Sequence, residues 1–110
     1  MEHITNEIIL RGQLQALPEF SHENHGKRFC RFYLEVSRLS GAVDILPVIA
    51  EDKLLEQLDP TAGEMLTVTG QVRSHNQRSD GARHLLIFVF ASTVAVEDGE
   101  PVNAASPHID

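Results

Sequence analysis

The stretch Val68-Thr69-Gly70-Gln71-Val72-Arg73-Ser74-His75-Asn76 is the most informative part of the chain for the fold, and its first half alternates apolar and polar residues. Such alternation is typical of a strand with one face buried and the other in solvent. The following residues, 76–84, are polar and contain Arg78 and Arg83 against the single acid Asp80, so they predict a loop before a second apolar strand. We therefore expect a strand, a basic loop and a strand to form an arm, which is the first place to look for function.

Three segments upstream of this stretch also predict strands. Residues 6–14 and 29–38 alternate, and residues 43–50 form an almost continuous apolar run. Gly12 indicates a bulge or sharp bend in the first segment, and Pro47 indicates an edge or bulge in the third, because proline cannot donate to a ladder. The inward face of the second segment is expected to carry Cys30, Phe32, Leu34 and Val36, and its outward face Phe29, Arg31, Tyr33 and Glu35.

The remaining segments predict one loop, one helix and two strands. Residues 17–26 have a proline near one end and a glycine at the other, which is typical of a loop. Residues 51–58 start with acids and place three leucines on one face, so they predict a short helix that residues 59–63 end. Strands are expected at 65–73 and 84–96.

This order of elements predicts an all-β protein with the OB-fold. The OB-fold is a five-stranded Greek-key barrel, here with one short helix between the third and fourth strands plugging one end. A small antiparallel sheet covered by one helix would produce a similar pattern. We assign residues 1–96 to the OB-fold domain. Residues 97–110 lose the periodicity and contain two prolines, so we expect a disordered tail.

Composition limits the class of protein. A chain of 110 residues can build one domain, and its 42% hydrophobic and 23% charged residues are ordinary for a globular protein. No apolar run approaches the roughly 18 residues of a membrane helix. The single cysteine, Cys30, cannot form an intramolecular disulfide. We therefore expect a cytoplasmic protein without a membrane segment.

The charge is unevenly distributed along the chain. The net charge of −7 argues against a nucleic-acid partner when it is taken alone. Residues 27–44 and 71–93, however, each carry a local charge of +2, whereas residues 45–70 and 94–110 are acidic. The two basic regions are either solvated strand faces or the binding surface for a polyanion.

The sequence contains no pattern that predicts catalysis. His22 and His25 lie three residues apart, but no cysteine or second pair completes a coordination shell, so we expect no metal site. A phosphate-cradling glycine loop and a nucleophile elbow are both missing. We therefore expect a non-enzymatic protein without a cofactor.

Four segments resemble the bacterial single-stranded-DNA-binding (SSB) family, and in particular its short, PriB-like branch. They occur in the family's order and are Asn6-Glu7-Ile8-Ile9-Leu10-Arg11-Gly12, Phe32-Tyr33-Leu34-Glu35-Val36, Leu46-Pro47-Val48-Ile49 and Gly63-Glu64-Met65-Leu66-Thr67-Val68-Thr69-Gly70-Gln71-Val72-Arg73-Ser74. The resemblance covers residues 6–96. It implies an OB-fold that assembles into dimers or tetramers.

The resemblance also implies sequence-tolerant binding of single-stranded DNA, with a role in DNA replication, recombination or repair. Such binding requires cations along the phosphates and aromatic faces on which bases stack. The residues expected to supply them are Arg11, Arg28, Arg31, Tyr33, Arg38, Arg73, His75, Arg78 and Arg83. RNA binding through the same face is an alternative that the sequence leaves open.

Two departures from the family support a second hypothesis. The chain has no tryptophan, and Gln77 stands where larger members usually place a stacking one. It also ends without the acidic, phenylalanine-ended tail through which family members recruit partners. The alternative function is therefore a protein-interaction module of a primosome-like replication-restart complex, with weak affinity for single-stranded DNA.

The last predicted strand is apolar on both faces. Phe88 and Phe90 share the parity of Val94, whereas Leu85, Ile87 and Val89 have the other parity. One face can fill the barrel, and the other then requires a different cover. We expect Phe88 and Phe90 to lie in a subunit interface of a homodimer or homotetramer.

Overall fold

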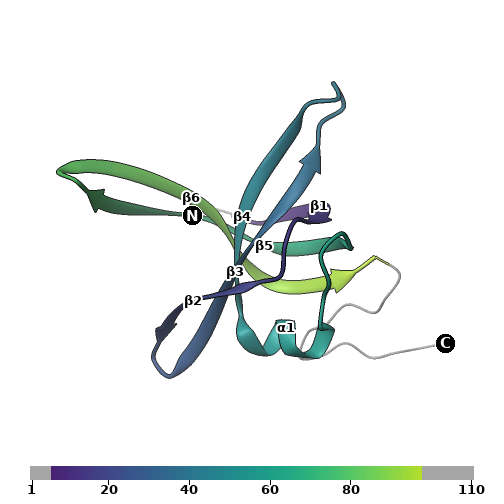
Figure 1. Ribbon diagram of the computed structural model, residues 1–110, viewed down its shortest axis with the longest axis horizontal. Helices are drawn as coiled ribbons and strands as arrows, with labels where there is room; N and C mark the ends of the chain where they lie inside the picture. Colours follow the sequence, from purple (N-terminus) through teal and green to yellow (C-terminus); the bar gives the residue numbers. More distant parts are fainter. Residues whose placement is uncertain (1–5, 98–110) are drawn as a thin grey trace, which may run out of the picture.

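The computed structural model describes residues 6–97, in which the chain forms six strands and one helix (Figure 1). The strands are β1 (Ile8–Leu14), β2 (Glu19–Asn24), β3 (Lys27–Ser37), β4 (Val43–Glu51), β5 (Met65–Ser79) and β6 (Ala82–Val96). The helix α1 (Asp52–Leu58) joins β4 to β5. The tail predicted at 97–110 lies, apart from Glu97, outside the described residues.

The strands close into a barrel. The order in the sheet is β1-β5-β6-β4-β3-β2, and the end of β1 also pairs with β3, so that Gln13 is opposite both Met65 and Glu35. β4 and β6 pair in parallel, and the other strand pairs in residues 6–97 are antiparallel. Closure in this order confirms the predicted five-stranded OB-fold, which β1, β3, β4, β5 and β6 form.

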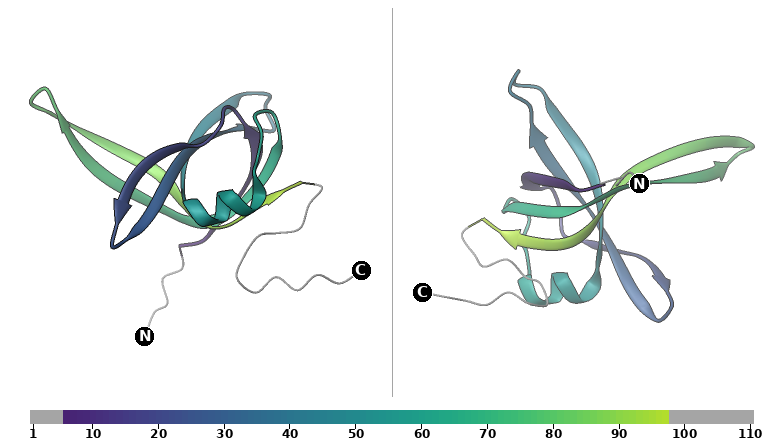
Figure 2. Two further views of the ribbon diagram at one scale, coloured as in Figure 1. Left: turned by 60° about the horizontal axis from the view of Figure 1, so that its bottom comes forward. Right: turned by 180° about the vertical axis from the view of Figure 1, so that it is seen from behind.

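The core fills the barrel with side chains from alternate strand positions. The largest fully buried side chains are those of Phe32, Leu14, Leu34, Leu66, Val48, Val68 and Val94. Leu55 of α1 joins this core from one end, where the helix lies across the barrel opening as predicted (Figure 2, left). Burial of each such leucine, valine or phenylalanine contributes roughly 1.5–3 kcal/mol, so this interior is the main source of stability.

A bulge in β6 lies beside a glycine of β5. Thr69 pairs with Thr93 but Gly70 pairs with Ala91, which leaves Ser92 as the extra residue. The Ser92 hydroxyl donates a hydrogen bond to the Thr69 carbonyl oxygen at 3.0 Å. A Cβ atom at Gly70 would overlap the backbone of Phe90, so glycine is required for the two strands to approach this closely.

The bulge changes which residues of β6 face the core. Val89 and Ala91 before the bulge and Val94 after it are all buried in the barrel. Phe88 and Phe90 are half-buried and point away from that interior. The expectation that Phe88 and Phe90 share a face with Val94 is therefore wrong, because one extra residue reverses the alternation.

Two segments predicted as loops are instead strands of hairpins. Residues 17–26 contain β2, which pairs with β3, and residues 76–84 continue β5 and β6 to the end of their hairpin. The hairpin turns are His25-Gly26, with φ of 52° and 78°, and Asp80-Gly81, with φ of 52° and 77°. Positive φ at both central residues is the geometry of type I′ turns, which match the twist of paired strands. Polar residues belong to these strands because both faces of an outlying hairpin meet solvent.

β4 has an edge where the sequence predicts one. Residues 43–51 pair with β3, and the parallel pairing with β6 begins at Val48 and Ile49, directly after Pro47. Proline at such an edge leaves no ladder hydrogen bond unmade. Within the described part of the chain no helix is long and apolar enough to cross a membrane.

Candidate nucleic-acid interface

A groove lies on the outside of the barrel between three hairpin elements. Residues 71–88, which we call the arm, are the half of the β5–β6 hairpin that extends beyond the barrel (Figure 1). The groove has a volume of about 960 Å³ and is lined by Ser21, His22, Arg31, Tyr33, Pro47, Ile49, Arg73, Ser74, His75, Leu86, Ile87 and Phe88. These residues come from β2, β3, β4 and the arm, which are the elements that form the oligonucleotide site of OB-folds.

The lining differs in charge from the rest of the molecule. Two arginines and two histidines line the groove, and none of its twelve lining residues is acidic, although the chain contains 16 acids. Most of the other lining side chains are apolar or aromatic. A concave, partly apolar surface with cations and no carboxylate favours an anionic ligand that also has flat apolar parts.

Arg31 and Tyr33 stand on the same face of β3, as its alternation predicts. Opposite them on β4 are Ile49 and Pro47, which form an apolar floor between the two strands. The Tyr33 side chain is 42% exposed, so its ring offers a face to a ligand in the groove. A guanidinium and a phenol two residues apart provide both a phosphate contact and a stacking surface.

Arg73 lies across the groove from Arg31 and Tyr33, in β5 near the root of the arm. Its guanidinium carbon lies 4.0 Å from the ring centroid of Phe90, and its Nη2 donates to the Gln71 side-chain oxygen at 3.2 Å. Both contacts leave donors of the guanidinium available, because the planar group has five N–H bonds. Arg73 is therefore oriented by its own chain, and no carboxylate of residues 6–97 is paired with it.

Three aromatic rings, His22 of β2, Phe29 of β3 and Phe90 of β6, are in contact beside the groove. His22 stacks on Phe29 with ring centroids 4.8 Å apart and 12° between the planes, and Phe29 packs against Phe90 at 5.6 Å. Phe29 belongs to the outward face of β3 as predicted, but it is buried under His22 and Phe90. These contacts hold β2 and the part of β6 next to the arm against the same phenylalanine, Phe29.

The arm carries further predicted residues towards its tip. In an antiparallel ladder directly opposed residues share a face, so His75 and Leu86 lie on the side of Arg73 and Phe88. At the tip, Arg78 and Arg83 are opposed and both exposed. Like charges in directly opposed positions destabilise a hairpin unless an anion lies nearby. The position is therefore suited to a phosphate.

Three predicted arginines lie outside the lining residues and next to carboxylates. Arg11 forms an ion pair with Glu97, and Arg28 lies 4.0 Å from Asp52 while its guanidinium covers the ring of Phe20. Their charges are partly compensated within the chain. The structure thus brings together Arg31, Tyr33, Arg73 and His75, with Arg78 and Arg83 further along the arm, and separates Arg11, Arg28 and Arg38 from them.

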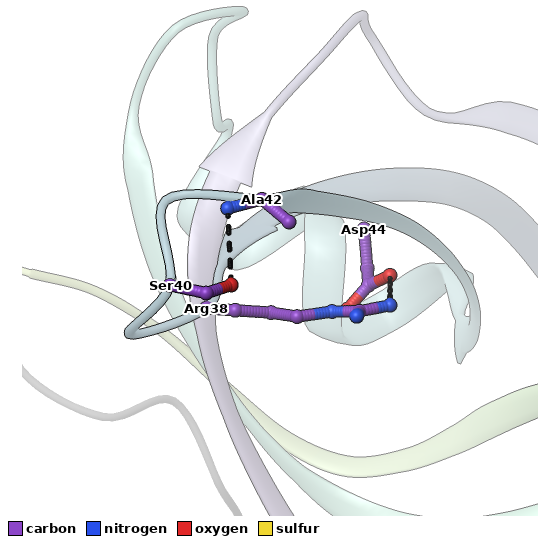
Figure 3. Close-up of polar contacts among 4 residues, drawn as sticks. All are labelled: Arg38, Ser40, Ala42 and Asp44. Carbon is purple, nitrogen blue, oxygen red and sulfur yellow. Dashed lines mark hydrogen bonds and ion pairs between the residues drawn. The ribbon is translucent and has the colours of Figure 1, made fainter.

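Arg38 is held at the far end of the β3–β4 hairpin. Its Nε and Nη2 donate to the two carboxylate oxygens of Asp44 at 2.7 and 2.6 Å (Figure 3). The same turn places the Ser40 hydroxyl 3.4 Å from the Ala42 amide nitrogen, which donates to it. The Arg38 guanidinium holds the pKa of Asp44 below its ordinary value. This bidentate pair closes the turn and leaves Arg38 less suited to a phosphate.

Several lining residues were not identified from the sequence. His22 and Ser21 belong to β2, which the composition of residues 17–26 did not predict as a strand. Ile49 and Leu86 were assigned to apolar runs, and nothing in those runs placed either residue at a groove. The signal that identifies His22 is its position opposite Phe29 across a hairpin, and recognition of the His25-Gly26 turn would have been required to find it.

This chain is an OB-fold protein. The features that define the fold are the closed barrel, the parallel β4–β6 pairing and the groove across β3 and β4. The N-terminal domain of PriB from Thermoanaerobacter tencongensis, a dimeric structure, superposes with a TM-score of 0.71 at 36% sequence identity, over 83% of this chain and 94% of that one. The chain belongs to the PriB-like branch of the SSB family.

A more distant structure has the same fold. The SSB of Plasmodium falciparum, solved in complex with single-stranded DNA, superposes with a TM-score of 0.73 at 16% identity, over 87% of this chain and 97% of that one. No protein-family model and no curated protein sequence matches the chain.

Proposed function

We propose that this protein binds single-stranded DNA in the groove, without marked sequence preference, and acts in the cytoplasm in DNA replication, recombination or repair. The observation that carries this proposal is the lining of the groove: cations and aromatic rings without a carboxylate, in a chain of net charge −7. Membership of the PriB-like branch and the DNA bound to the Plasmodium falciparum SSB support it.

In the proposed complex the phosphates follow Arg31 and Arg73, which lie on opposite walls of the groove. Bases stack on Tyr33 and Phe88, and each stacked base contributes about 1–3 kcal/mol. Arg78 and Arg83 extend the phosphate path along the arm. Sequence tolerance follows because every base has a face that can stack, whereas the lining offers few groups that would distinguish base edges.

We further propose that the protein acts as a homodimer, which the dimeric PriB domain supports. A homotetramer is the alternative assembly. The interface role of Phe88 and Phe90 stays a prediction. Phe90 already contacts Phe29 and Arg73 of its own chain, and Phe88 lines the groove, so a subunit seated there would compete with the nucleic acid.

Fluorescence anisotropy with a labelled oligo(dT) tests the DNA proposal. We expect micromolar or tighter binding at about 50 mM salt that weakens strongly by about 200 mM, because phosphate contacts release counterions. An oligo(U) of equal length measures how far RNA is accepted. Absence of oligo(dT) binding even at low salt contradicts the proposal.

The arm supports the second candidate function, a protein-interaction module of a primosome-like replication-restart complex. Leu85 is 61% exposed and Ile87 57%, and these neighbours lie on a two-stranded ribbon without a barrel beneath it. Exposed apolar residues of this kind are typical of protein-interaction sites. The same anisotropy experiment separates the two candidates, because an interaction module needs no affinity for oligo(dT).

A further inference from the structure

Asn6 makes an unusual connection between the start of β1 and the root of the arm. Its side-chain Nδ2 donates to the Val72 carbonyl oxygen at 2.7 Å, and its Oδ1 accepts from the Val72 amide at 3.0 Å. Both bonds lie just beyond the regular ladder of β1 with β5, which ends at Ile8 opposite Gly70. In that register residue 6 is opposite residue 72. A primary amide therefore replaces the next backbone pair of the ladder.

Val72 is where the arm leaves the barrel. Beyond Gly70, β5 no longer pairs with β1 and pairs with β6 alone. Without Asn6, the edge of β5 at Val72 would therefore face solvent. An isolated two-stranded ribbon is only marginally stable in water. The Asn6 amide supplies a third partner at the root of this ribbon and fixes the backbone of Val72 against the barrel.

The residue next to Val72 is Arg73. The direction of the Arg73 side chain depends on the backbone at positions 72 and 73, because successive residues of a strand point to opposite faces. The cation–π contact with Phe90 holds the far end of that side chain, and Asn6 holds the backbone from which it starts. Two independent anchors thus define where the guanidinium lies in the groove.

We infer that Asn6 is a positioning residue of the nucleic-acid groove, which sets the root of the arm and through it the place of Arg73. This inference rests on the proposed DNA-binding function. Asn6 itself is not among the residues that line the groove, so its effect on binding passes through Val72 and Arg73.

The test uses the full chain, a labelled oligo(dT) and the variants Asn6→Ala and Asn6→Asp. Asn6→Asp keeps an acceptor for the Val72 amide but places a carboxylate beside the Val72 carbonyl oxygen. We expect each variant to weaken oligo(dT) binding roughly three- to tenfold, which is the scale of one or two net hydrogen bonds. The Val72 amide should exchange its hydrogen about tenfold faster in Asn6→Ala, even without DNA.

Gln13→Ala is the matched control. Gln13 lies at the other end of β1, and its Nε2 donates to the Gly63 carbonyl oxygen at 2.9 Å, so this variant also removes a side-chain hydrogen bond to backbone. We expect Gln13→Ala to change the melting temperature about as much as Asn6→Ala does, with no loss of oligo(dT) affinity. Equal affinity losses in the two variants would show a general effect on stability and overturn the inference.

A double-mutant cycle separates positioning from a direct effect. In an Arg73→Ala background, Asn6→Ala should weaken binding by less than about twofold, because coupled residues are not additive. Additive losses, or unchanged affinity of Asn6→Ala when the wild type binds, overturn the inference and leave the proposed function standing. A wild-type protein that does not bind oligo(dT) overturns the proposed function, and the inference with it.

Discussion

Arg73 has an oriented guanidinium group in the proposed DNA-binding groove. Its guanidinium is oriented by Phe90 and Gln71, without a paired carboxylate in the described part of the chain, and Tyr33 lies across the groove with its ring exposed. We expect Arg73→Ala and Tyr33→Ala each to weaken oligo(dT) binding about tenfold, since each removes a proposed phosphate or stacking contact. Anisotropy measures the affinity, and thermal unfolding should show little change in melting temperature.

The Arg11→Ala variant provides the comparison for Arg73→Ala. It removes the same charge from an exposed strand position, but Arg11 lies outside the groove lining and faces Glu97. Binding should therefore remain within about twofold of the wild type, as expected when an exposed pair is lost away from the ligand. If Arg73→Ala and Tyr33→Ala lower the melting temperature and leave the affinity intact, their assignment to the site is wrong.

The surroundings of Cys30 disfavour the charged thiolate form of its side chain. Burial and the nearby Asp52, whose Oδ1 lies 3.4 Å from the Cys30 sulfur, raise the pKa of the thiol to about 11. The raised pKa means that the contribution of this thiol to folding stability is complete below about pH 9 and is lost as the pH rises towards 11. Asp52→Asn should lower the pKa, because it removes the charge that disfavours the thiolate.

Thiolate absorbance followed against pH measures this effect of Asp52→Asn. The matched variant is Asp44→Asn, which removes a carboxylate paired with Arg38 at the other end of the β3–β4 hairpin. It should leave the Cys30 titration unchanged. A Cys30 titration that is the same in the wild type and in Asp52→Asn would show that Asp52 does not contribute to the raised pKa.

At the scale of single elements, the β6 bulge depends on Gly70. Substitution Gly70→Ala forces a Cβ atom against the Phe90 carbonyl group, and such overpacking typically costs about 1–3 kcal/mol. We expect a fall in melting temperature of several degrees by thermal unfolding. Gly81→Ala is the comparison, since no atom lies within 4 Å of its Cβ position and the cost comes from its positive φ of 77°. A smaller loss at Gly70 than at Gly81 would contradict the packing argument.

The elements that the sequence predicted correctly are those with one buried face. β1, β3 and β5 were recognised because residues such as Leu10, Phe32 and Val68 alternate with polar ones. β4 was recognised from its apolar run, and α1 because its leucines share a face. β2 was missed because neither of its faces meets the barrel core, so it has no apolar period. The part of β5 after Arg73 and the start of β6 at Ala82 were missed for the same reason, although Asp80-Gly81 is a strong hairpin signal.

The candidate site was predicted only in part, because local sequence shows some of its features and contacts between segments determine the others. Arg31, Tyr33, Arg73 and His75 followed from strand parity and charge, which are local properties. Arg38 forms an ion pair with Asp44 across the turn of the β3–β4 hairpin, and the burial of Phe29 depends on β2 and Phe90. These contacts join different strands or cross a turn, and no periodicity within one segment contains them.

For the whole molecule, the segregation of charge determines how binding responds to salt. If Arg31, Arg73, Arg78 and Arg83 each neutralise one phosphate, the slope of log K against log salt should be about −3, at roughly −0.7 per phosphate of a single strand. The net charge of −7 enters less, because the acids lie outside the groove lining and charges further than about 10 Å are screened at 0.1 M salt.

A pair of double variants tests whether position or total charge controls this slope. Arg78→Ala with Arg83→Ala and Arg11→Ala with Arg38→Ala each remove two positive charges from the chain. The first pair should reduce the magnitude of the slope by about 1.4, because two phosphate contacts are lost, whereas the second should leave it unchanged. Equal changes in both would mean that DNA responds to the overall field of the molecule. A difference confined to the arm would mean that the strand runs from the groove towards the tip, where the opposed Arg78 and Arg83 gain the anion that relieves their repulsion.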